Sequence, residues 1–175
     1  MLLLLALLFP PVRGHTRSKV TDARNDISQI NAAVKAYHTE YGKYPVVRDA
    51  TLSEGLKGNV ELMQCVIGTD AFRIPQQISF FEGMQAKRTS GWFKPAVYGG
   101  GFHPKSGDYL DPWGRPYQIV LGTDYDGVIP NPYLDEPEQQ IRSGVIVWSL
   151  GKDGIFGRSA DQDKHTRPDD VVSWR

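Results

Sequence analysis

The sequence predicts a mixed α+β domain, and three observations predict it. A single apolar stripe with spacings of three and four residues runs from Val20 to Tyr41, which indicates an amphipathic helix. Two segments rich in strand-forming residues, 117–121 and 145–148, lie in the C-terminal half. Glycine, proline and aspartate gather between and after these segments, as expected for turns and long loops.

Composition limits the classes of function. The chain has 175 residues, which is enough for one domain with a hydrophobic core, and its 20 basic and 20 acidic residues cancel. A neutral balance gives no general attraction to nucleic acid, so no nucleic-acid partner is expected. Cys65 is the only cysteine, which excludes an internal disulfide and a cysteine-based zinc site.

Residues 1–17 are interpreted as part of a hydrophobic membrane segment with a basic flank. The run LLLLALLF at positions 2–9 is followed by two prolines and several basic residues. Eight apolar residues are fewer than the roughly 20 that span a bilayer. The run also has the length of a secretory signal core, but lacks a preceding basic residue and a small-residue cleavage site. A third interpretation is the second half of a longer membrane helix, with basic residues at the membrane surface.

Residues 18–43 are predicted as the amphipathic helix itself. Ser18 or Thr21 can cap its start, and Gly42 can take the left-handed conformation that ends a helix. Pro45 prevents continuation. We expect the stripe to pack on the chain's own domain, with a coiled-coil partner as the alternative.

Residues 44–175 are predicted as one globular domain. Apolar residues between 46 and 89 suggest one or two short helices, and no catalytic group is recognisable there. Asp111 begins a turn, DPWGRP, that leads into the strand at 117–121. This strand is expected to pair antiparallel with 145–148 across a proline-rich excursion. Asp124 and Asp126 resemble the start of a calcium loop, but the required glutamate is missing, so a simple turn is expected.

The last 26 residues, 149–174, form a long loop that closes on two valines and a tryptophan. A loop with so few apolar side chains needs another source of order. The loop contains five aspartates: Asp153, Asp161, Asp163, Asp169 and Asp170. Clustered carboxylates beside glycines suit a hard cation, and calcium is the ion expected. A solvated loop without a metal is the alternative.

Four segments resemble a known family. The segment from Tyr37 to Pro45 reads YHTEYGKYP, typical of bacterial type IV pilin-like proteins. The segments DPWGRPY (111–117), SLGKDG (149–154) and DDVVSW (169–174) resemble the G-type major pseudopilin of the type II secretion system. The resemblance covers roughly residues 18–45 and 108–174. It implies a pilin-like α+β fold, in which a long N-terminal amphipathic helix packs on a small antiparallel β-sheet and a C-terminal loop binds calcium.

The resemblance also implies a set of calcium ligands. Carried over by position, the carboxylates would come from Asp153, Asp169 and Asp170, and backbone carbonyls from Leu150 and Ile155. The stretch between Asp153 and Asp169 is longer than the family's loop, so Asp161 or Asp163 could substitute as ligands.

The implied function is structural and not enzymatic. Such a subunit is held in the bacterial inner membrane by its N-terminal hydrophobic segment, with its globular domain in the periplasm. It polymerises with other pseudopilin subunits and meets inner-membrane components of the secretion system. The family's basic leader, its phenylalanine start and its glutamate are not present in this sequence. We therefore expect a late start or a truncated chain, with the missing part encoded upstream of Met1.

Three other functions stay open from the sequence. One is a type IV pilus-like subunit for adhesion or DNA uptake, although its usual C-terminal cysteine pair is missing. Another is a secreted, calcium-stabilised binding module. The third is a secreted glycan hydrolase using two of the C-terminal carboxylates, which a glycine-rich loop would position poorly.

Overall fold

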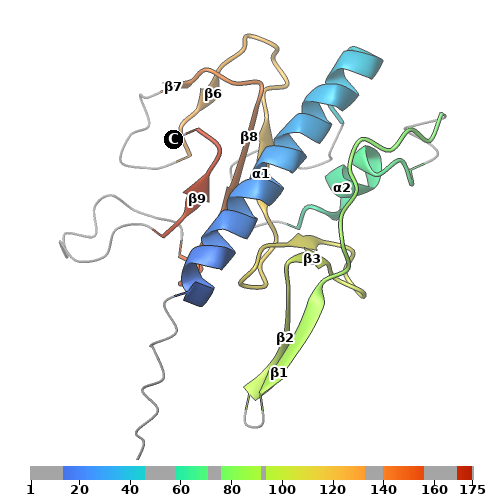
Figure 1. Ribbon diagram of the computed structural model, residues 1–175. Coiled ribbons are helices and arrows are strands. Elements are labelled where there is room, and N and C mark those ends of the chain that lie inside the picture. The colour runs from blue at the N-terminus through green and yellow to red at the C-terminus, as the bar shows by residue number, and fades with distance from the viewer. Residues whose placement is uncertain are drawn as a thin grey trace, which may run out of the picture.

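The computed structural model describes residues 14–45, 58–70, 76–91, 94–132, 140–155 and 169–174. Two helices, α1 (Gly14–Tyr41) and α2 (Val60–Val66), accompany nine short strands in this part of the chain. The strands are β1 (Lys87–Gly91), β2 (Lys94–Gly99), β3 (Gly101–Phe102), β4 (Tyr109–Leu110), β5 (Gln118–Leu121), β6 (Ile129–Pro130), β7 (Gln140–Ile141), β8 (Val145–Ser149) and β9 (Val171–Val172). Figure 1 shows α1 lying across β8, with α2 and the β1–β2 hairpin on the other side of the helix.

Helix α1 confirms the prediction that the apolar stripe packs on the chain's own domain. Ala23, Ile27, Ile30 and Val34 are buried in the main core, and Tyr37 is buried at its end. The helix begins at Gly14, earlier than the predicted caps, because an apolar stripe marks only the turns that pack. It ends as predicted, with Gly42 in the left-handed conformation (φ +68°).

Strand β8 is the centre of the core. It pairs antiparallel with β5, as predicted from the sequence, and on its other edge with β9. Alternate residues of a strand point to opposite faces, so β8 serves two clusters. Val145 and Val147 pack in the cluster that contains α1, whereas Ile146 and Trp148 pack in a second cluster with Leu150.

The predicted fold class is wrong in the number and arrangement of its β-sheets. In place of one small antiparallel sheet, the described strands form four separate antiparallel sheets: β1–β2, β3–β4, β5–β8–β9 and β6–β7. Five of the nine strands are only two residues long. Gly100 separates β2 from β3 with a left-handed φ of +66°, and Pro130, which has no N–H to donate to a ladder, is the last residue of β6. The fold is mixed α and β, but it is not the single-sheet arrangement that the resemblance implied.

Asn59 joins the start of α2 to the strands. Its side-chain amide donates to the backbone oxygens of Tyr109 (2.9 Å) and Tyr117 (3.1 Å), and its oxygen accepts from the Tyr109 N–H at 2.8 Å. Asn59 is buried, so these bonds satisfy polar groups that water does not reach.

Among the described residues, no helix has the length and apolar character needed to cross a membrane. The predicted membrane segment, apart from its last residues, lies outside the described residues, as do Asp161 and Asp163.

Candidate metal centre

The DPWGRP turn is organised by the carboxylate of Asp111, which is fully buried. Its Oδ1 accepts the N–H groups of Trp113 and Arg115, each at 2.9 Å, and its Oδ2 accepts the Ser149 hydroxyl at 2.6 Å. Two backbone bonds, Gly114 N–H to Asp111 O (3.0 Å) and Asp111 N–H to Arg115 O (2.7 Å), close the turn. One carboxylate therefore shapes this turn and ties it to the end of β8.

The chain after β8 turns sharply over residues 149–155. The Gly151 N–H donates to the Ser149 hydroxyl at 3.1 Å, and the Gly154 N–H donates to the Leu150 carbonyl at 3.2 Å. Gly151 and Gly154 have φ of +63° and +71°, a conformation that favours glycine. Added side chains would collide with Asp169 at Gly151 and with the Arg115 guanidinium at Gly154. The two glycines thus permit both partners to approach the backbone.

Arg115 closes one side of this turn. Its guanidinium donates to the carbonyl oxygens of Gly151 (3.1 Å), Lys152 (3.5 Å) and Asp153 (3.3 Å). The Arg115 guanidinium thus satisfies these three carbonyl oxygens, so they need no metal ion as a partner. The carbonyls of Leu150 and Ile155, which the resemblance assigns to calcium, are not among those that Arg115 contacts.

Asp169 closes the other side. Its Oδ2 accepts the N–H groups of Lys152 (2.6 Å) and Asp153 (3.3 Å). Its Oδ1 is buried and has no hydrogen-bond partner among the described residues. A buried carboxylate oxygen without a donor is costly and fits a cation ligand.

The structure brings some of the predicted ligands together. Leu150, Asp153 and Ile155 share the turn, and Asp169 is hydrogen-bonded to it. The Asp153 carboxylate is exposed and accepts the Ile155 N–H at 2.9 Å. Asp170 is half-buried beside Asp169. Within the described ranges, no three His, Cys, Asp or Glu side chains form a group that could hold a metal. The donor chemistry fits a hard cation, with the remaining oxygens still to come from carbonyls or from residues outside those ranges.

Sequence reasoning missed Asp111, Ser149 and Arg115 as members of this site. The DPWGRP motif predicts a turn, but Ser149, the hydrogen-bond partner of Asp111 in that turn, lies 38 residues further along the chain. No local pattern in the sequence indicates that pairing.

A second polar cluster lies between α1 and the strands. Asp26 accepts the hydroxyls of Tyr117 (2.8 Å) and Tyr109 (3.3 Å). Burial raises the pKa of Asp26 above its ordinary value of 3.8, and the two hydrogen bonds oppose this rise without cancelling it. Burial and the Asp26 charge also raise the pKa of both tyrosines, so the hydroxyls keep their protons and α1 stays bonded to the strands.

Replacing Asp26 by asparagine is expected to flatten the pH dependence of stability in the acidic range. A folded-state pKa above the unfolded value gives stability that is complete below pH 3.8 and is lost as pH rises through the folded pKa. Asparagine does not titrate, so this loss disappears. Melting temperatures of wild type and Asp26→Asn from about pH 3 to about pH 7 test this. Glu40→Gln, at an exposed position of α1, should keep the wild-type slope, and parallel curves for wild type and Asp26→Asn would contradict the assignment.

No family model, curated protein or solved structure matches the chain. The function must therefore be inferred from the residues and their arrangement.

Proposed function

We propose that the chain is a structural subunit of a type II secretion pseudopilus, a periplasmic filament that supports protein export. The observation that carries the proposal is the joining of two motifs. DPWGRPY and SLGKDG, the segments that resemble the G-type pseudopilin, are bonded to each other through Asp111, Ser149 and Arg115. These two segments lie far apart in the sequence, resemble the same family and form one structural unit. Together they support a pseudopilin role more strongly than either segment alone.

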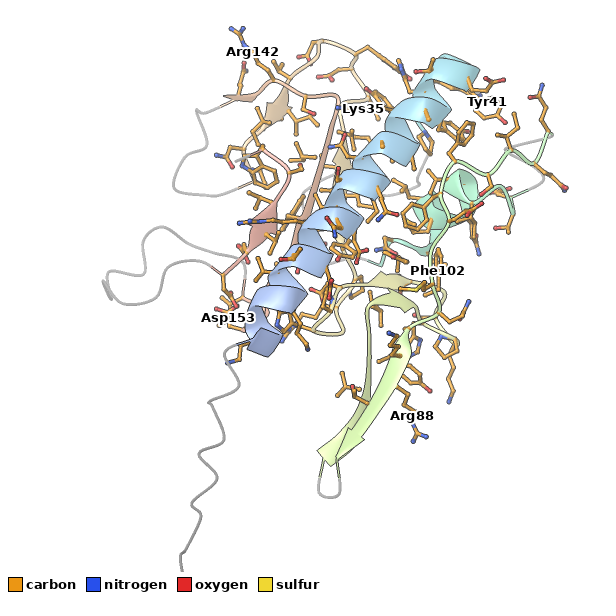
Figure 2. All side chains as sticks on the ribbon, in the orientation of Figure 1. Lys35, Tyr41, Arg88, Phe102, Arg142 and Asp153 are labelled. Atoms are coloured by element: carbon orange, nitrogen blue, oxygen red, sulfur yellow. The ribbon has the colours of Figure 1, made fainter. Side chains whose placement is uncertain are left out.

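The position of this unit also supports the proposal. Lys19, near the N-terminal end of α1, donates to the Pro112 carbonyl of the DPWGRP turn at 2.8 Å. The Asp153 turn lies beside the same end of the helix (Figure 2). A membrane-held subunit would leave the membrane through this end of α1, so an ordered turn here would stiffen the base of the globular domain where subunits meet.

The proposal includes a calcium ion bound by the C-terminal loop. Asp153, Asp169 and Asp170 supply carboxylates and Leu150 and Ile155 supply carbonyls, with Asp161 or Asp163 as further candidates. The buried, unpartnered Asp169 Oδ1 supports a cation at this point. When bound, calcium would order the C-terminal loop, because its carboxylates repel one another without it.

Overproduction of the protein from its own gene, with the DNA upstream of Met1 included, in the bacterium that encodes it tests the filament role. We expect sheared surface filaments that contain the protein, seen by electron microscopy and immunoblot. Recovery of the protein only as a soluble monomer in the periplasm or medium would contradict a filament subunit and favour a secreted binding module.

A further inference from the structure

A basic groove runs between α1 and the C-terminal strand β9. Its volume is about 450 Å³, and it is lined by Arg24, Ser28, Asn31 and Lys35 of α1 and by Ser173 after β9. None of the described residues that line it is acidic. Arg24 and Lys35 are exposed, and within the described residues neither side chain makes an ion pair. The groove therefore carries two cationic side chains that are unpaired among the residues the structure describes.

The groove also presents hydrogen-bond donors between its cations. Arg24 and Lys35 lie at the two ends, about 16 Å apart along the helix by the usual rise per residue. The Ser173 hydroxyl accepts the Val147 N–H at 3.0 Å, which leaves its own hydrogen free to donate. Cations at both ends and donors between them suit a partner that carries more than one carboxylate.

An exposed acidic turn at the far end of α1 has this chemistry. Asp124 and Asp126 are exposed on either side of Tyr125, which is 54% exposed and left-handed (φ +59°). The Tyr125 hydroxyl accepts the Tyr44 N–H at 3.2 Å, and the two rings stack with centroids 5.5 Å apart. The turn is thus held against Tyr44 and His38, with its carboxylates in solvent.

We infer that the acidic turn Asp124–Tyr125–Asp126 of one copy docks in the basic groove of the next copy. The inference rests on the proposed function, since it names the contact between subunits. Anchored beside His38, the turn lies about 13 Å along α1 from the middle of the groove by helix rise. A neighbour displaced along the helix by about that distance brings its turn level with the groove. Because two different patches meet, the contact is heterologous and repeats from copy to copy, as a filament requires.

Cysteine cross-linking in cells tests the contact with the full chain. Ala32→Cys places a thiol in the groove, and Thr123→Cys places one beside the acidic turn, at two exposed positions. Differently tagged Ala32→Cys and Thr123→Cys copies are co-expressed and treated with a short bismaleimide, and the mixed dimer is quantified. Ser106→Cys, also exposed, replaces Ala32→Cys in a matched control pair. The native Cys65 is buried and serves as background in all samples.

Charge reversal then identifies the residues involved. Arg24→Glu with Lys35→Glu should lower the mixed dimer about tenfold or more, because like charges across an interface are strongly disfavoured. Asp124→Lys with Asp126→Lys should do the same, and carrying both reversals in each copy should restore the cross-link. Arg88→Glu with Lys105→Glu makes the same charge change at exposed sites, of which Arg88 lies on the β1–β2 hairpin (Figure 2), and should leave the cross-link unchanged.

The outcomes separate the docking contact from the proposed function. Equal cross-linking in the Ala32 and Ser106 pairs, or charge reversals without effect, would overturn the contact even if filaments form and export proceeds. Loss of binding to anionic lipid vesicles by the Arg24 and Lys35 variant, with no mixed dimer in wild type, would also overturn it and assign the groove to lipid. The proposed function is tested separately, by filament formation on overproduction and by export from cells without the gene.

Discussion

Replacing Asp111 by alanine is expected to lower the free energy of unfolding by about 3 to 5 kcal/mol, because a buried charged partner is removed from a network. The change leaves the N–H groups of Trp113 and Arg115 without their acceptor and removes the acceptor of the Ser149 hydroxyl. The turn that orients Arg115 toward the 151–153 carbonyls would lose its shape as well.

Urea denaturation of wild type and Asp111→Ala measures this change. Asp111→Asn should lose less, since the amide keeps one acceptor oxygen for the two N–H groups. Asp124→Ala is the matched control, because its carboxylate is exposed, and it should change stability by less than about 0.5 kcal/mol. Equal stability of Asp111→Ala and the control would show that the buried network does not hold the two motifs together.

Removing calcium is expected to lower the melting temperature by about 5 to 10 °C. A ligand at a hundredfold excess over its Kd adds about 2.7 kcal/mol to the free energy of unfolding. For a chain of 175 residues, each kcal/mol corresponds to about 2 to 4 °C. The Asp169 Oδ1, buried without a donor among the described residues, is expected to gain most from the cation.

Melting curves with calcium and with a chelator, for wild type and Asp169→Asn, test the site. The asparagine keeps an acceptor for the Lys152 and Asp153 N–H groups but lacks the charge that binds calcium. Wild type should show the shift and Asp169→Asn should lose it, whereas Asp124→Asn should behave as wild type. A wild-type melting temperature that is the same with calcium and with the chelator would contradict the calcium site and favour a solvated loop without a metal.

The local elements were predictable from the sequence because their signals are local. The spacing of Ala23, Ile27, Ile30 and Val34 predicted the buried face of α1, and all four are buried. Strand β8 carries a continuous apolar run of the length of a buried strand, β5 is rich in strand-forming residues, and their pairing was correctly predicted.

The arrangement of the sheets was not predictable in the same way. Two-residue strands such as β6 and β9 are too short to show an alternating pattern. Their pairing depends on segments that are distant in the sequence, as where β9 places Val172 opposite Trp148 and Val171 opposite Ser149 of β8. The candidate site was also only partly predictable. Its aspartates can be identified in the sequence, but the hydrogen bond between Ser149 and Asp111 is seen only in the folded structure.

Export from cells that lack the gene tests the central claim most directly. If the chain is a pseudopilus subunit, deletion should abolish release of folded exported proteins into the medium and cause them to accumulate in the periplasm. Wild-type protein should restore export, whereas Asp111→Ala, which disrupts the joined motifs, should restore it poorly. Undiminished export in the deletion strain would contradict the account.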